Sequence, residues 1–217
     1  MTQLLVIKSD DIQKGGVYQF SDMIINGLRK EEEMFVVGLG SAISMACMAV
    51  QRAASISKVA IGELALDYIG SPALGLGGAF FILNKEPKRN WDAEKKALEK
   101  GMKLNFERSG QLIVVSSNLP PERAIPMALS KLAESDSLKI SAAGSAINRE
   151  ALIALELTKG NIAKDKLGIT LIVISTVKHT VKEIVVPETV MEIFIKKGCE
   201  TAYSKKHEQI LKNLTSG

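Results

Sequence analysis

Two glycine–serine turns with the same four residues carry hydroxyl side chains that could contact an anion. The stretch GSAI at 40–43 recurs at 144–147. Each copy follows a short apolar run and precedes a long amphipathic segment, a pattern that predicts a strand, a turn and a helix. We expect Ser41 and Ser145 to be N-cap residues, because a serine hydroxyl accepts hydrogen bonds from the first free N–H groups of a helix. The same helix starts could hold a small anion.

The other candidates for contacts to phosphate are cationic or imidazole side chains in loops, at helix starts or just beyond strands of the expected fold. They are Lys8, Lys14, Arg123, Arg149, Lys178, His179 and Lys182. Lysine and arginine bind phosphate oxygens and displace counterions from a nucleic-acid backbone, so these side chains suit a polyanionic partner. For Lys178 and Lys182, ordinary exposed charge on a hairpin is an interpretation of equal weight.

Patterns typical of enzymes and metal sites are absent from the sequence. It contains no nucleophile elbow, no carboxylate pair at catalytic spacing and no cluster of metal ligands. The glycine-rich stretch 70–78 lacks the lysine that a P-loop places after its glycines. His179 and His207 are far apart and have no partner motif. We therefore expect no catalysis, no cofactor and no metal ion.

Composition is typical of a soluble globular protein. Among the 217 residues, 46% are hydrophobic and 24% are charged, which is enough apolar material for a core. The net charge of +4 permits a polyanionic partner without demanding one. Cys47 and Cys199 lack metal-type spacing, and no signal peptide or apolar run of membrane length is present. We therefore expect a cytoplasmic chain with reduced thiols and no membrane contact, and leave association with the nucleoid open.

The elements that would position the candidate residues follow the same order in both halves. The first half predicts strands at 3–9, 34–38, 58–69 and 79–84, with helices at 17–30 and from residue 40 onward. The second half predicts strands at 111–117, 138–142, 167–177 and 190–196, with helices at 120–135 and 148–160. The first strands, QLLVIKS and QLIVVSS, are near copies of each other. An internal repeat therefore organises the chain.

This repeat divides the chain into four expected segments. They are a first repeat at 1–86, a basic linker at 87–109, a second repeat at 110–198 and a polar tail at 199–217. The linker is rich in lysine and arginine, and a helix from Asp92 to Lys103 is expected in it. A solvated linker helix is the favoured interpretation, and an arm that faces phosphate is the alternative.

The order strand, helix, strand, GSAI turn, helix and β-hairpin resembles the Alba family of nucleic-acid-binding proteins, and its bacterial relative, the stage V sporulation protein S family. The Alba turn typically reads GRAIS, whereas this chain has GSAIS at 40–44 and GSAIN at 144–148. The resemblance implies an α+β fold of two tandem βαβαββ domains that form an intrachain pseudo-dimer, with loops that grip a DNA or RNA backbone. Serine replaces the arginine of both turns. Where the family has a lysine pair after the first strand, the first repeat offers only Lys8 and Lys14, and the second only Arg123 beyond the double proline.

Three functions follow, in decreasing order of preference. The first is a non-catalytic protein of chromatin or regulator type that binds the phosphate backbone of DNA or RNA. The second is a protein–protein module that kept the fold without nucleic-acid binding, with an apolar surface at Ala73, Leu74 and Leu76. The third is an enzyme that binds a small anion at the glycine turns. A protein partner and a homo-oligomer both stay open.

Overall fold

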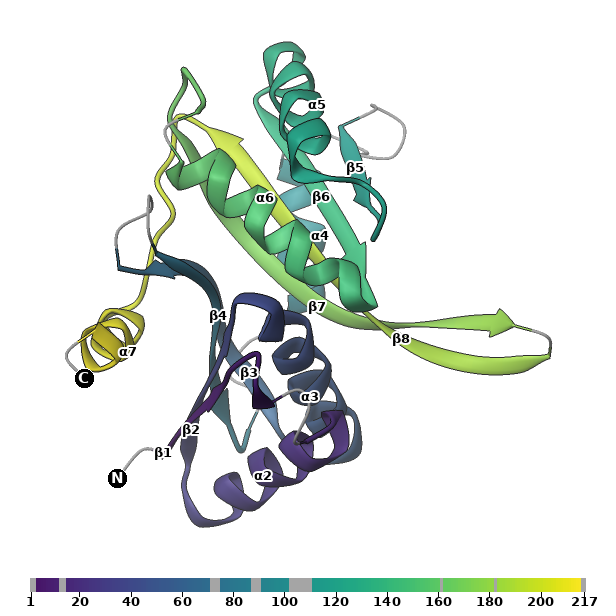
Figure 1. The fold of residues 1–217 in the computed structure, drawn as a ribbon, viewed down its shortest axis with the longest axis vertical. Helices are drawn as coiled ribbons and strands as arrows, with labels where there is room; N and C mark the ends of the chain where they lie inside the picture. The colour runs from purple at the N-terminus through teal and green to yellow at the C-terminus, as the bar shows by residue number, and fades with distance from the viewer. Residues whose placement is uncertain are drawn as a thin grey trace. The chain divides into compact units, whose positions relative to one another are not determined.

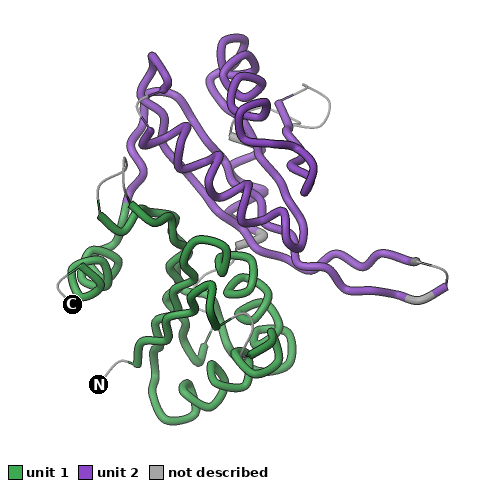
Figure 2. The backbone as a smooth tube through the Cα atoms, in the orientation of Figure 1, with its two compact units in different colours: residues 1–89, 203–217 green, residues 90–202 purple. Residues whose placement is uncertain are grey.

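The chain folds into two compact units (Figure 2). The computed structural model describes residues 3–11, 15–70, 75–86, 91–101, 111–160, 162–181 and 183–215. The first unit combines residues 1–89 with the C-terminal segment 203–217, and the second comprises residues 90–202. The predicted contact residues Lys14 and Lys182 lie outside the described residues, as do Ala73 and Leu74 of the first hairpin.

The first unit is a four-stranded sheet with two helices of the repeat on one face (Figure 1). Its elements are β1 (Gln3–Ile7), α2 (Val17–Lys30), β2 (Glu33–Leu39), α3 (Ile43–Ile56), β3 (Ala60–Ile69) and β4 (Leu76–Asn84). The strand order is β1-β2-β4-β3, with β1 parallel to β2 and the other neighbours antiparallel. Apolar side chains recur every three or four residues along α2 and α3, so each helix buries one face.

The second unit repeats this topology and adds a helix before it. Its elements are α4 (Trp91–Gly101), β5 (Leu112–Val115), α5 (Pro121–Glu134), β6 (Ser137–Ala143), α6 (Ile147–Lys159), β7 (Leu167–Val181) and β8 (Ile184–Lys197). The strand order β5-β6-β8-β7 corresponds to that of the first unit strand by strand. The predicted α+β class and the βαβαββ order of each half are therefore confirmed. The pairing of the two units as an intrachain pseudo-dimer stays a prediction.

The prediction that Ser41 and Ser145 cap helices is wrong. A single turn of 3-10 helix, Gly40–Ala42 or Gly144–Ala146, separates each strand from the α-helix that follows. The N-cap residues of α3 and α6 are Ala42 and Ala146, and neither helix has a capping hydrogen bond from that side chain. Each serine is thus the middle residue of a tight turn, because the chain turns three residues before the α-helix begins.

The second hairpin is longer than predicted. The sequence suggested that Lys178 and His179 follow a strand, but both lie within β7, which pairs with β8 through Val181 and Ile184. The segments 176–181 and 184–189 form what we call the β7–β8 ribbon (Figure 1). Their valines and threonines favour extended backbone, which accounts for the extra length. Pro187 has no N–H to donate, which an exposed ribbon edge tolerates.

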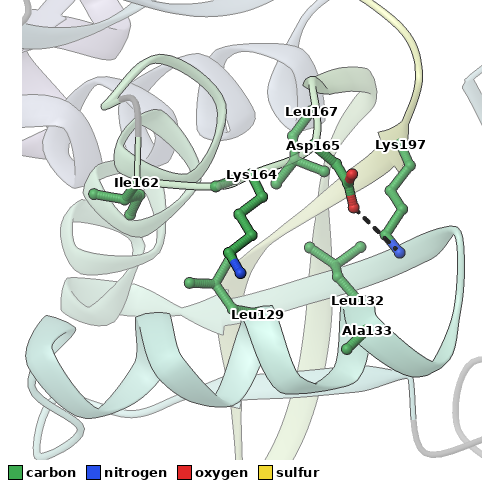
Figure 3. A pocket seen from close by; sticks show the side chains of 9 residues that line it. Leu129, Leu132, Ala133, Ile162, Lys164, Asp165, Leu167 and Lys197 are labelled. Atoms are coloured by element: carbon green, nitrogen blue, oxygen red, sulfur yellow. Dashed lines mark ion pairs between the residues drawn. The ribbon is translucent and has the colours of Figure 1, made fainter.

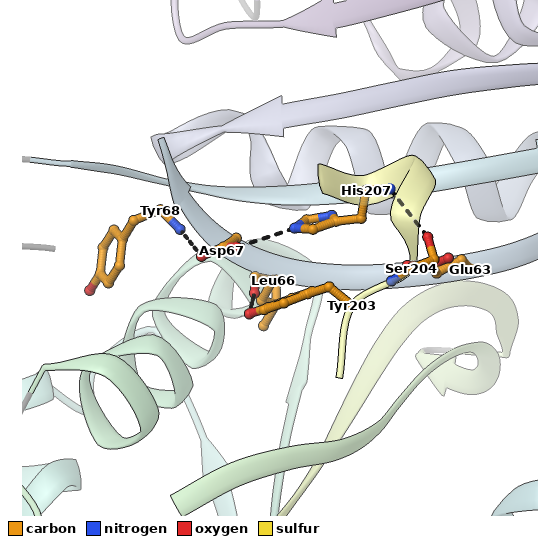
Figure 4. A network of polar contacts seen from close by, with 7 residues as sticks. All are labelled: Glu63, Leu66, Asp67, Tyr68, Tyr203, Ser204 and His207. Atoms are coloured by element: carbon orange, nitrogen blue, oxygen red, sulfur yellow. Dashed lines mark hydrogen bonds and ion pairs between the residues drawn. The ribbon is translucent and has the colours of Figure 1, made fainter. Parts of the chain in front are cut away.

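A C-terminal helix, α7 (Lys205–Thr215), covers the other face of the first sheet. Ile210, together with Leu211 and Leu214, packs on a cluster around Phe80. Buried His207 lies 3.2 Å from the Asp67 carboxylate through Nε2, and the Tyr203 hydroxyl donates to the Leu66 carbonyl at 2.8 Å (Figure 4). The segment expected as a polar tail therefore supplies a helix to the first unit.

Helix α4 covers the corresponding face of the second sheet. Leu98 packs on the cluster formed by Leu171, Val173 and Phe194. Beside this cluster, the Glu192 carboxylate accepts from the Lys139 ammonium at 3.0 Å and from that of Lys95. The basic segment between the repeats is helical at 91–101, and its helix is anchored to the sheet by both apolar contacts and an ion pair.

Two glutamates in the second unit have pKa values shifted in opposite directions. Burial raises the pKa of Glu150, which is fully enclosed, and the negative charge of Glu192 raises it further, although the Ala142 backbone N–H favours the carboxylate. For Glu192, burial acts in the same upward direction. The hydrogen bonds and charges of Lys95 and Lys139 outweigh burial, so the pKa of Glu192 is lowered.

We expect Glu192→Gln to destabilise the chain by about 3 kcal/mol, the cost typical of removing one partner from a buried ion pair. The reason is that Lys139, only 6% exposed, keeps its charge but loses its carboxylate. Urea denaturation at pH 7 measures the loss. Glu200→Gln, which breaks the exposed Lys166–Glu200 pair, is the control and should leave the midpoint unchanged. Equal midpoints for the two variants would contradict the prediction.

We expect Glu150→Gln to gain stability relative to the original chain as the pH rises. A carboxyl group with a raised folded pKa stabilises fully below its unfolded value of about 4.3, and this contribution is lost as the pH rises through the folded pKa. Glutamine cannot ionise, so the variant escapes that loss. Urea midpoints of both proteins at pH 5 and pH 8 test this. A difference that stays constant between the two pH values would refute the assignment.

Candidate nucleic-acid interface

In the first unit, the loop after β1 and the glycine turn after β2 lie at one edge of the sheet. The two strands are parallel and adjacent, so their carboxyl ends meet there. The Ser9 and Ser41 hydroxyls are hydrogen-bonded at 2.7 Å. The Lys8 backbone N–H donates to the Asp11 carboxylate at 2.9 Å, which shapes the loop. The Lys8 and Ser41 side chains are exposed, so the edge presents an ammonium and a hydroxyl to solvent.

The second unit brings together the corresponding loop and turn through an arginine. The Arg149 guanidinium donates to the backbone carbonyls of Ser117 and, at 3.2 Å, Leu119. Arg149 is half-buried and is used to hold the loop after β5 against α6. Arg123 is exposed in the first turn of α5, and Ser145 is exposed in the glycine turn. The Arg123 guanidinium therefore faces solvent, whereas some N–H groups of Arg149 are already bonded to carbonyls of the loop.

The glycine turns of the two units have the same backbone but different neighbours. Gly40 and Gly144 have φ of +56° and +55°, in the left-handed region that favours glycine. The side chain nearest to a Cβ placed on Gly40 belongs to Leu76, and the nearest for Gly144 belongs to Glu188. The Glu188 carboxylate also pairs with His179 Nε2 at 3.2 Å. A carboxylate at the second turn opposes phosphate binding there, and the first turn has a leucine instead.

The β7–β8 ribbon presents two different faces to solvent. Residues directly opposite in an antiparallel pair share a face, so Lys178 lies with Pro187, and His179 lies with Val186. Val177 and Val186, on the histidine face, are 39% and 44% exposed. The Lys178 side chain is exposed on the other face and has no ion pair among the described residues. Val185, which is 56% exposed, lies with Pro187 on the Lys178 face, so each face of the ribbon combines apolar side chains with charged or imidazole ones.

The structure therefore groups some predicted contact residues and separates others. Lys8 and Ser41 share an edge of the first sheet, and Arg123 and Arg149 flank the loop 117–120 of the second unit. Ser145 precedes Arg149 at the start of α6, while Lys178 and His179 lie on opposite faces of the ribbon.

Sequence reasoning missed three residues at these edges. Ser9 bonds to Ser41, the Ser117 carbonyl accepts from Arg149, and Glu188 lies over the second glycine turn. Ser9 and Ser117 were visible as the matching last residues of QLLVIKS and QLIVVSS. Glu188 gave no comparable signal, because its position depends on the register of a hairpin whose strands extend beyond the predicted ones.

Neither a metal centre nor a membrane helix is found in the described ranges. No group of three or more histidine, cysteine, aspartate or glutamate side chains there could hold a metal ion. No helix among those residues is long and apolar enough to cross a membrane.

We expect Gly144→Ala to cost about 1–2 kcal/mol, because a non-glycine residue is strained at this positive φ. Its Cβ would also lie 2.8 Å from the Glu188 carboxylate, which must move. Gly16→Ala is the matched control, since φ there is −102° and nothing lies within 4 Å of the new carbon. Thermal unfolding of both variants tests this. A Gly144→Ala protein as stable as the control would contradict the strain assigned to the turn.

Comparison with known proteins finds similarity among solved structures. No family model matches the chain, and no curated protein matches it. Alba from Thermoplasma volcanium is similar in structure, at 15% identity and a TM-score of 0.36. The match covers 39% of this chain and 98% of that one.

Proposed function

We propose that this chain binds the phosphate backbone of DNA or RNA without catalysis, as a protein of chromatin or regulator type. The observation that carries the proposal is the exposed β7–β8 ribbon, with the Lys178 ammonium free of ion pairs among the described residues. A two-stranded ribbon has the width to enter a nucleic-acid groove, and a lysine on it can reach phosphate oxygens at the rim.

The edges of the two sheets supply further donors for this role. Lys8 offers an exposed ammonium in the loop that also carries Ser9, whose hydroxyl is bonded to that of Ser41, and hydroxyls are common donors to phosphate oxygens. Arg123 offers an exposed guanidinium in the second unit. The remaining proposed contacts are Lys14, Ser145, Arg149, His179 and Lys182. Contacts of this kind, from loops to the nucleic-acid backbone, are what the sequence resemblance implies.

Acidic groups near these donors limit the strength of binding. Asp11 lies in the Lys8 loop, and Glu188 lies between His179 and the second turn. Each nearby carboxylate offsets part of the attraction of a cation for phosphate. Binding should therefore be weak, independent of sequence and strongly dependent on salt, with few phosphates neutralised.

We expect the chain to shift a 20-base-pair DNA duplex at about 50 mM salt, with a slope of log K against log salt near −2.7. That value counts only the exposed cations among the described residues, Lys8, Arg123 and Lys178, at about 0.9 per contact, and contacts from Lys14 or Lys182 would make the slope steeper. Lys178→Ala should reduce the magnitude of the slope by about 1. Electrophoretic shifts over a salt series measure both quantities, and single-stranded RNA assayed in parallel decides which nucleic acid is preferred.

Lys205→Ala is the matched control, because it removes an exposed lysine of α7 that is not among the proposed contacts. It should lower affinity less than Lys178→Ala does. If neither nucleic acid is shifted at about 50 mM salt, the proposal is wrong, and a role in protein–protein interaction is the remaining candidate. Binding with equal slopes for both variants would remove the ribbon from the interface.

A further inference from the structure

The second unit contains a pocket that the proposed function does not use (Figure 3). Its cavity volume is about 280 Å³, and α5, the loop after α6, β7 and β8 line it. The apolar lining includes Leu129, Leu132, Leu167 and Ile162. This volume lies just below the range of about 300–1,000 Å³ usual for small-molecule pockets, so a small ligand is the appropriate size.

The wall of the pocket is an addition to the fold that the two units share. Residues 160–166 separate α6 from β7, whereas only residues 57–59 separate α3 from β3. The longer loop contributes Ile162, Lys164 and Asp165 to the lining. Ala133 also lines the pocket, and the residue at the same place in the equally long helix α2 is Arg29. The repeat therefore forms without a loop of this length, and the longer loop supplies Ile162, Ala163, Lys164 and Asp165 to the pocket.

Two ammonium groups lie at this pocket. Lys164 extends its side chain toward Leu129 (Figure 3), and within the described part of the chain it has no ion pair. Lys197 lies 3.5 Å from the Asp165 carboxylate, with the lysine side chain 23% exposed and the aspartate 63% exposed. An ion pair this long and this well hydrated contributes little, so Lys197 can take a second anionic partner at small cost.

We propose that this pocket binds a small aliphatic monocarboxylate, with its chain on the leucines and its carboxylate between Lys164 and Lys197. The uncharged side chains of the lining are all aliphatic, so a hydrocarbon chain fits them better than a polar or charged body does. Two cations face one carboxylate of the protein, so the site favours one added negative charge. This proposal does not depend on nucleic-acid binding.

Octanoate is the probe, with acetate and 1-octanol as controls that carry only the head or only the chain. Titrations of the full chain are followed by amide chemical shifts of α5 and of residues 162–166 in the loop before β7. We expect octanoate to bind with a Kd of about 1 mM, as for a ligand of this size, and both controls to bind at least about threefold more weakly. Equal affinities for octanoate and 1-octanol would overturn the role of the lysines, and no octanoate shifts at about 10 mM would overturn the site.

Three variants separate the pocket from general charge effects. Ala133→Trp fills the pocket from an exposed position of α5, so it should fold and lose octanoate binding. Lys164→Gln should weaken binding about threefold. Lys196→Gln removes an exposed charge that does not line the pocket and should bind octanoate like the original chain. Unchanged binding by a folded Ala133→Trp protein, or equal weakening by the two lysine variants, would refute the proposal.

Discussion

Each four-stranded sheet has two largely apolar faces, and the repeat supplies helices for only one of them. An apolar sheet face left in water forgoes the stabilisation of burial, about 25 cal/mol for each Å². The chain meets this constraint with helices from outside the repeats. Helix α7 covers the open face of the first sheet and α4 that of the second. With both faces covered in the described part of the chain, the proposed nucleic-acid contacts lie at the sheet edges, in loops and on the β7–β8 ribbon.

The two covering helices are anchored by different chemistry. Around α7, the His207–Asp67 contact and the Tyr203 hydroxyl bond lie within an apolar cluster. Around α4, the Glu192 carboxylate forms ion pairs with Lys95 of α4 and with Lys139 of β6. Buried polar groups cost free energy unless they are paired, so each anchor favours one docked position over others. This explains why ionisable residues lie against otherwise apolar sheet faces.

The repeat also explains how one backbone can present different chemistry. Both glycine turns have positive φ and the same four residues, yet a leucine faces one and a glutamate faces the other. In the second unit Arg149 bonds to loop carbonyls, where the first unit has a pair of serine hydroxyls. The units have thus kept the same path of the chain while the side chains around the turn diverged. Their electrostatic character differs accordingly, and so should their share in binding a polyanion.

The bounds of most helices and strands could be predicted from the sequence, because local patterns decide them. The period of apolar residues predicted α2 at its observed bounds, and the apolar runs before the glycines predicted β2 and β6 to within a residue or two at each end. The order of elements in the two halves followed from the repeat. The local pattern did not show that Ser41 and Ser145 are not N-caps. A 3-10 turn and the first turn of an α-helix differ by only one residue in hydrogen-bond spacing, so the sequence does not distinguish them.

Contacts between distant segments were decided only in the folded chain. That Glu188 lies at Gly144 depends on the pairing of β7 with β8, and that Arg149 bonds to Ser117 depends on α6 approaching the loop after β5. The docking of α7 joins residues more than a hundred positions apart. Local sequence patterns determine which elements form, because their hydrogen bonds and periodicity are short-range. Packing between elements decides which side chains meet at a sheet edge. Local sequence patterns carry no information about that packing.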